Sequence, residues 1–181
     1  MHFPEKEILL KDGRVAVFRT PSPADAAEMI EYMRRTAGET NYLLRTPEEV
    51  TMTVSEEEAF LNRIVKSEYD CMIVCTVDGK LAGNCQISRH NKRKNSHRAD
   101  VMIALLKDFW GLGIGTSMFG EMISLAKQWG LMQLELEVIE CNERAIGLYQ
   151  RMGFAAVAAK PNAIRLPDGT LLKEFIMVKT L

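Results

Sequence analysis

The feature that most constrains this fold is a short apolar run that leads through closely spaced glycines into an amphipathic helix. Residues 101–106 read VMIALL between charged neighbours, a pattern typical of a strand buried on both faces. Residues 111–115 read GLGIG, and apolar residues then recur at helical spacing over 118–129. A strand, a glycine-rich turn and a helix in this order leave backbone N–H groups unpaired at the positive end of the helix dipole. Such an arrangement binds phosphate.

The spacing of the glycines distinguishes between phosphate-binding motifs. A P-loop requires a Gly-Lys-Ser/Thr sequence, and no such lysine follows here. A dinucleotide fingerprint requires a third glycine where Thr116 or Met118 stands. The stretch WGLGIG resembles instead the acyl-CoA loop of the GNAT superfamily of N-acetyltransferases, Arg/Gln-x-x-Gly-x-Gly/Ala, with Trp110 in place of the usual first arginine. The backbone cradle is unaffected by that difference, although the glycines alone would also suit a plain strand–turn–helix corner.

A second motif tests the resemblance independently. The segment NERAIGLYQRMGF is similar to the GNAT pattern Asn-x-x-Ala-x-x-x-Tyr-x-x-x-Gly-Phe at Asn142, Ala145, Tyr149, Gly153 and Phe154. Each of these residues has a structural explanation as well: Asn142 suits a helix N-cap, Ala145 a core-facing stripe, Gly153 a helix C-terminus and Tyr149 a core aromatic. Two motifs in the family's order, and at about the family's spacing, identify the chain as a member of the GNAT superfamily.

The order of predicted elements indicates the fold class. Turn signatures at residues 11–13 and 78–79 predict two hairpins, and strands are expected again near 133–138, 154–159 and 173–179. A first helix is expected to end at Gly38, and a second to begin at Ser55, with Glu58 completing a capping box. Hairpins followed by strand–helix–strand units predict an α/β or α+β domain. The resemblance implies a GNAT-like three-layer α/β/α fold with a mixed, mostly antiparallel central sheet.

Composition bounds the remaining possibilities. The chain has 181 residues, which suits a single domain over residues 1–181. The 23 Lys and Arg residues balance the 24 Asp and Glu residues, so the overall charge indicates neither nucleic acid nor membrane as a partner. No basic and apolar leader is present, and the four cysteines form no Cys-x-x-Cys pair. We therefore expect a cytoplasmic protein with reduced thiols and no metal.

The resemblance implies attack of a primary amine on the thioester of acetyl-CoA. The amine must lose a proton, and family members often carry a carboxylate base on the strand before the glycine loop, where Asp100 stands. Glu137 on a later strand, or a bridging water, is the alternative. An N–H group near Leu105 would stabilise the oxyanion. Tyr149 would protonate the departing thiolate, because a phenol with a pKa near 10 can donate to it.

The resemblance also implies which residues bind acetyl-CoA. Pairing with the pantetheine arm is expected at Ile103, Ala104 and Leu105. The backbone amides expected to hold the pyrophosphate belong to Gly111, Leu112, Gly113, Ile114, Gly115 and Thr116. Asn142 would touch the cofactor arm.

The acceptor is less constrained than the cofactor. In this family it generally binds between the first two helices and a late hairpin, which correspond here to residues 24–66 and 161–172. Acidic and tyrosine residues in the first segment favour a cationic amine, namely Glu28, Tyr32, Glu39, Tyr42 and residues 56–58. Whether the acceptor is a small molecule or a peptide, which acyl chain is preferred, and whether the protein is a monomer or a homodimer are left open. The rival functions are a non-catalytic acyl-CoA sensor or scaffold and a nucleotide-binding module.

Overall fold

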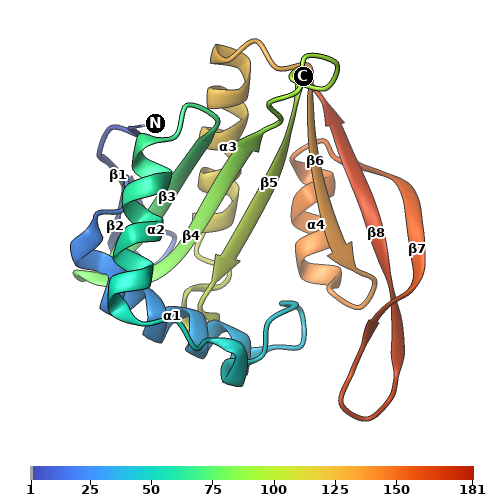
Figure 1. The fold of residues 1–181 in the computed structure, drawn as a ribbon, viewed down its shortest axis with the longest axis horizontal. Helices are drawn as coiled ribbons and strands as arrows, with labels where there is room; N and C mark the ends of the chain where they lie inside the picture. Colours follow the sequence, from blue (N-terminus) through green and yellow to red (C-terminus); the bar gives the residue numbers. More distant parts are fainter. Residues whose placement is uncertain (1) are drawn as a thin grey trace.

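The computed structural model describes residues 2–181 and contains one eight-stranded sheet in the order β1-β2-β3-β4-β5-β6-β8-β7 (Figure 1). Every neighbouring pair is antiparallel except β5 and β6, which are parallel. Helices α1 and α2 lie in front of the sheet in Figure 1, and α3 and α4 lie behind it. The predicted three-layer fold with a mixed, mostly antiparallel sheet is therefore confirmed.

The strands are β1 (Lys6–Leu9), β2 (Val15–Arg19), β3 (Asp70–Val77), β4 (Lys80–Arg89), β5 (Arg98–Leu105), β6 (Gln133–Ile139), β7 (Ala155–Arg165) and β8 (Leu171–Thr180). The helices are α1 (Ala26–Glu39), α2 (Val54–Lys66), α3 (Ile114–Gln128) and α4 (Glu143–Arg151), with short 3₁₀ turns η1 (Pro23–Asp25), η2 (Pro47–Glu49) and η3 (Lys107–Phe109). None of the helices in residues 2–181 is both long enough and apolar enough to cross a membrane.

The end of α1 and the start of α2 both differ from the sequence prediction. Gly38 does not end α1 but lies inside it, and a Cβ atom there would stand 3.4 Å from the Pro47 ring of η2. A side chain at this position would make an ordinary van der Waals contact, so the space does not require glycine, and α1 continues one residue beyond it to Glu39. The capping box of α2 is Thr53 with Glu56, not Ser55 with Glu58: the Thr53 side chain accepts from the Glu56 N–H, and the Glu56 carboxylate accepts from the Thr53 N–H. Both pairs fit the capping-box pattern, so the sequence does not distinguish them. The structure does, because the helical backbone begins at Val54.

Two hydrophobic clusters hold the layers together. The larger one lies between the sheet and α3, where Met118, Phe119 and Met122 are fully buried. The smaller one packs α1 and α2 against the other face, around Leu61 and Val74. Cys71, Cys75 and Cys85 are buried free thiols, as the sequence predicted, and Cys141 is exposed.

The parallel pair β5–β6 is short. Its register covers only Arg98↔Gln133, Ala99↔Leu134 and Asp100↔Glu135, after which the two strands diverge (Figure 1). This divergence corrects the prediction that the apolar run is buried on both faces, because Met102 is 57% exposed and Asp100 is also exposed. Farther along this face Ala104 and Leu106 pack in the α1–α2 cluster, so Met102 is left uncovered. The divergence of β6 from β5 opens the middle of the sheet into a cleft.

Candidate active site

One edge of β5 faces the cleft with unpaired backbone groups. Leu105 is the register partner of Gly83, and the N–H of Leu106 donates to the Ala82 carbonyl at 3.0 Å. In an antiparallel ladder this geometry turns the N–H of Leu105 away from β4, and the alternation gives Ile103 the same orientation. Because β6 pairs with β5 only as far as Asp100, both N–H groups point into the cleft. The β5 edge can therefore accept an added strand-like ligand.

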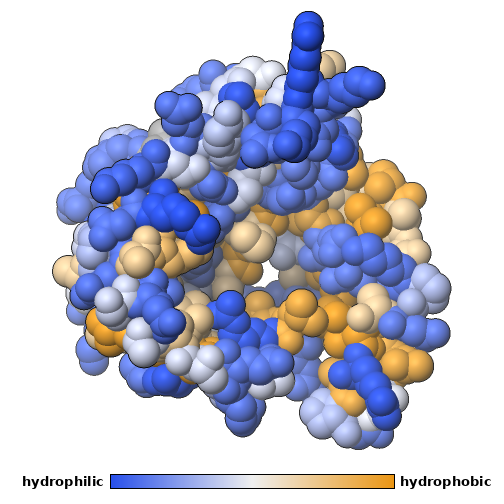
Figure 2. Space-filling view, viewed as in Figure 1, coloured by the Kyte–Doolittle hydropathy of each residue, from blue (hydrophilic) through white to orange (hydrophobic). Residues whose placement is uncertain are grey.

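A cavity of about 380 Å³ lies against this edge. Its lining includes Tyr149 and every predicted cofactor-binding residue except Leu112, namely Ile103, Ala104, Leu105, Gly111, Gly113, Ile114, Gly115, Thr116 and Asn142. Figure 2 shows the surface hollowed between the α1–α2 half and the β6–β8 half, with hydrophobic atoms around the opening. The two sequence motifs, which lie on different elements, thus meet at one cavity.

The glycine loop presents its backbone amides to this cavity. Within the described chain, the N–H groups of residues 111–116 have no hydrogen-bond partner, and the first helical bond of α3 runs from the Ser117 N–H to the Gly113 carbonyl at 3.0 Å. Gly111 and Gly113 have φ angles of 83° and 99°, which side-chain-bearing residues rarely adopt. Leu112 instead packs on the core, and its carbonyl accepts from the Lys11 N–H at 3.2 Å. The loop has the form of an anion-binding cradle.

Tyr149 reaches the cavity from α4. The helix begins at Asn142, whose Oδ1 accepts from the Ala145 N–H at 3.2 Å. The Tyr149 ring packs 5.2 Å from the Phe119 ring and is 8% exposed. This burial raises the pKa of Tyr149 to about 12, so its hydroxyl remains a proton donor at neutral pH.

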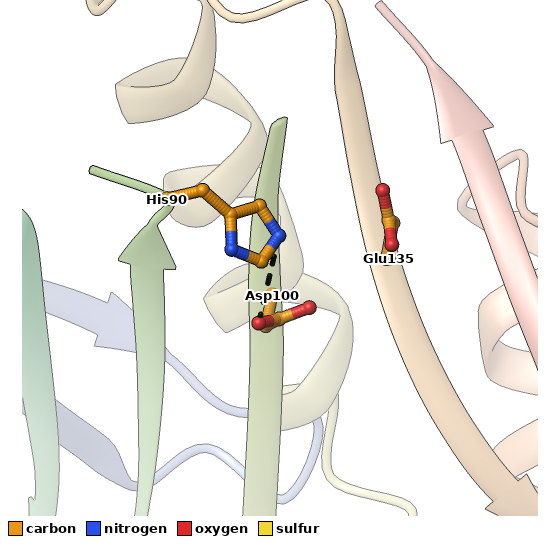
Figure 3. A group of neighbouring side chains, drawn as sticks. All are labelled: His90, Asp100 and Glu135. Atoms are coloured by element: carbon orange, nitrogen blue, oxygen red, sulfur yellow. Dashed lines mark ion pairs between the residues drawn. The ribbon is translucent and has the colours of Figure 1, made fainter. Parts of the chain in front are cut away.

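Asp100 lies on the face of the sheet opposite Tyr149, and it is not among the residues that line the cavity. Its side chain is 54% exposed, and its Oδ2 is 3.8 Å from the His90 Nε2 (Figure 3). Partial burial raises the pKa of Asp100; the nearby His90 lowers it and the nearby Glu135 carboxylate raises it again. A raised pKa moves this carboxyl toward the range in which it can exchange protons near neutral pH.

The neighbouring carboxylates are already paired. Glu135 accepts from Arg98 at 2.6 Å and from Gln133 at 2.8 Å, and Glu137 forms an ion pair with Lys160. Asp100, among residues 2–181, has no lysine or arginine partner. Ligand atoms of His90, Asp100 and Glu135 lie within 4.8 Å of one another, a spacing that a cation could occupy, but Glu135 is committed to Arg98. The absence of a metal stays a prediction from the sequence.

The acidic residues near α1 and α2 have structural roles. The Glu28 carboxylate accepts from the Leu81 N–H at 2.7 Å, and Glu39 accepts from Arg35 and from the Lys107 N–H. The buried Tyr32 hydroxyl lies 2.7 Å from the Ala104 carbonyl oxygen. These contacts join α1 to β4, to β5 and to η3, so the acidity of this segment does not by itself indicate a cationic acceptor.

A second hollow of about 450 Å³ adjoins the first and shares Thr40, Tyr42 and Trp110 with it. It is formed by the α1–α2 connection, the exposed Cys141 and Leu166 of the β7–β8 turn. The two segments that the sequence analysis assigned to the acceptor therefore meet beside the cofactor cavity.

The family comparison decides the classification. The model of the acetyltransferase (GNAT) family matches residues 30–154, which span the cleft, the glycine loop and Tyr149. The chain belongs to the GNAT acetyltransferase family. An uncharacterized N-acetyltransferase of Methanocaldococcus jannaschii is 35% identical to this GNAT chain over 96 residues. That match covers 50% of this chain and 42% of the relative, so the chain matches less than half of the relative's length.

Solved structures share the GNAT fold. A GNAT acetyltransferase from Streptococcus pneumoniae superimposes with a TM-score of 0.86 at 28% identity, covering 92% of this chain and 99% of that one. A putative acetyltransferase from Salmonella typhimurium, solved with its cofactor acetyl-CoA, gives a TM-score of 0.78 at 17% identity, covering 92% and 94%. A ribosomal-protein-alanine N-acetyltransferase from Brucella melitensis gives 0.78 at 17% identity, covering 91% and 99%. At these lower identities the likeness concerns the fold alone.

Basic residues at the cavity were missed by the sequence analysis. Lys11, Arg144 and Arg151 all line it, and they come from the β1–β2 turn and from α4. The one signal that could have pointed to them is the missing arginine of the glycine loop, because Trp110 occupies its place. Periodicity and motif spacing do not show which lysine or arginine side chains from other parts of the sequence fold next to the glycine loop.

Proposed function

We propose that the protein is an N-acetyltransferase that moves the acetyl group of acetyl-CoA to a primary amine by direct attack. The observation that carries this proposal is the meeting of three features in one cavity: the unpaired β5 edge, the amides of residues 111–116 and the Tyr149 hydroxyl. Each feature suits one part of the reaction. Together they can hold a diphosphate, align an extended arm and protonate a leaving group.

The order of these features fixes how the cofactor would lie. The diphosphate sits at residues 111–116, and the pantetheine arm follows the β5 edge from Leu105 toward Ile103. The thioester then lies near the Ile103 N–H, which donates to the developing oxyanion in place of the N–H near Leu105 that the sequence suggested, while the Leu105 N–H pairs with the arm. Asp100 is three residues before Ile103, or roughly 10 Å along the strand at roughly 3.3 Å per residue. At that separation Asp100 acts as base through a relay of waters rather than by direct contact with the amine.

The acid and the base act from opposite sides of the sheet. Tyr149 approaches from the α3–α4 side, where it donates a proton to the CoA thiolate as the carbon–sulfur bond breaks. Asp100 accepts the proton that the amine loses, from the face of the sheet that carries α1 and α2. In the tetrahedral intermediate the amine nitrogen and the sulfur are separate substituents of one carbon, so a different group can serve each proton transfer.

Ligand-dependent stability tests the cofactor assignment. We expect acetyl-CoA to raise the melting temperature, because a ligand at 100 times its Kd adds about 2.7 kcal/mol to the free energy of unfolding. Differential scanning fluorimetry with acetyl-CoA, and with NAD at the same concentration as control, measures the effect. Stabilisation by NAD alone would instead support a nucleotide-binding module. Thiol release with polyamine, amino-acid and peptide amines then defines the acceptor, and binding without release for any amine would favour a sensor.

Replacing Asp100 tests the base. Since a base works only when deprotonated, the raised pKa of Asp100 should place the acidic limb of kcat/KM above the ordinary carboxyl pKa of about 4. We expect Asp100→Asn to lower kcat/KM by on the order of 10²-fold at neutral pH and to remove that limb. Thiol release measured from pH 5 to pH 9 provides the profile. Glu137→Gln is the matched control, and a larger loss there than in Asp100→Asn would transfer the role to Glu137.

A further inference from the structure

Trp110 replaces a loop arginine but remains part of the glycine loop's architecture. Its Nε1–H donates to the Leu105 carbonyl at 2.8 Å, which ties the loop to the end of β5. The guanidinium of Arg144 lies over the face of the Trp110 ring, with its Cζ 5.1 Å from the ring centroid. Lys107 also lies over this ring, at 6.0 Å, but it does not line the cofactor cavity.

Arg144 is close to the glycine loop although it comes from α4. Its Nη2 is 3.5 Å from the point where a Cβ atom on Gly111 would stand, and the residue lines the cavity. Among residues 2–181, no carboxylate forms an ion pair with Arg144. The guanidinium is therefore stacked on an aromatic ring with its N–H donors uncommitted, beside backbone amides that are also uncommitted.

We propose that Arg144, held on Trp110, is the cation that binds the CoA diphosphate in place of the missing loop arginine. This inference rests on the proposed acetyl-CoA site. Guanidinium suits the task because its planar fork pairs bidentately with phosphate oxygens and stacks on aromatic faces. Stacking also restricts the side chain before the ligand arrives, so less entropy is lost on binding. Arg63, whose Cζ lies 5.2 Å from the Phe60 ring centroid outside the cavity, serves as the comparison residue.

Calorimetric titration of the whole chain with CoA tests the proposal. We expect Arg144→Gln to weaken CoA binding roughly fivefold or more, because a hydrogen bond to a charged group is lost at a partly exposed site. Arg144→Lys should recover only part of the loss, since lysine lacks the fork. Trp110→Leu should weaken binding at least as much, because it also removes the bond from Nε1–H to the Leu105 carbonyl. The double variant should be no weaker than Trp110→Leu alone, because Arg144 acts through the Trp110 ring.

Ligand variants identify the phosphate. Dephospho-CoA keeps the diphosphate but lacks the ribose 3′-phosphate, so the proposal predicts the same loss for Arg144→Gln with either ligand. Arg63→Gln, which removes a guanidinium from the face of the Phe60 ring outside the cavity, should leave binding of both ligands unchanged. A loss seen with CoA but not with dephospho-CoA would overturn the diphosphate assignment and place Arg144 at the 3′-phosphate.

The outcomes separate this inference from the proposed function. Failure of the wild-type protein to bind CoA at all would remove both. Normal binding by the wild type together with equal binding by Arg144→Gln would remove only the role of Arg144. Circular dichroism of each variant shows whether it has folded, and Gly120→Ala on α3, whose added methyl group meets no atom within 4 Å, serves as the folded control.

Discussion

Replacing Tyr149 with phenylalanine should abolish most turnover while leaving acetyl-CoA binding intact. We expect kcat to fall on the order of 10²-fold or more, the usual contribution of a positioned general acid. The ring contacts with Phe119 and Phe154 do not involve the hydroxyl, so the variant should fold normally. Steady-state thiol release and calorimetric acetyl-CoA binding measure the two effects separately.

The pH dependence adds a second measurement for Tyr149. Its pKa of about 12 keeps the phenol protonated, so this group should cause no alkaline loss of kcat below about pH 11. Tyr69→Phe is the matched control, because Tyr69 is exposed and lies beside Arg89 rather than at the cavity. Unchanged turnover in Tyr149→Phe would remove Tyr149 as the acid.

Changing Gly113 to valine should weaken acetyl-CoA binding on the order of 30-fold. Gly113 is the N-cap of α3 with φ of 99°, where a β-branched residue is strained by about 1–3 kcal/mol. The loop can relieve that strain only by turning its amides, and the diphosphate then loses its hydrogen bonds. Calorimetric titration with CoA measures the loss.

The control for the loop is Gly120→Ala on the same helix. Gly120 lies in the interior of α3, so alanine there should stabilise the fold by about 0.5–1 kcal/mol and leave CoA binding unchanged. Denaturant titration of both variants separates a defect in the loop from a defect in the helix. Equal CoA affinity in Gly113→Val and the wild type would show that the amides of residues 111–116 do not hold the ligand.

Local features of the sequence predicted local structure well. The Asp78–Gly79 turn joins β3 and β4 with positive φ at both residues, as the dipeptide indicates. Asn142 caps α4, and Gly153 follows its last turn with φ of 88°. Choices between similar local signals were less reliable, as the capping box at Thr53 rather than Ser55 shows. Thr53 and Ser55 are each followed three residues later by a glutamate, so both satisfy the capping-box pattern.

The sequence by itself determined the glycine loop, the tyrosine helix and the alternation that makes β6 two-faced, because turns, caps and periodicity depend on neighbours along the chain. Only the tertiary structure decided that β6 leaves β5 after Asp100, and that α4 places Tyr149 on the face of the sheet opposite Asp100. It also placed Arg144 on Trp110. Open strand edges and contacts between distant side chains depend on how complete elements pack, and no short stretch of sequence specifies that packing.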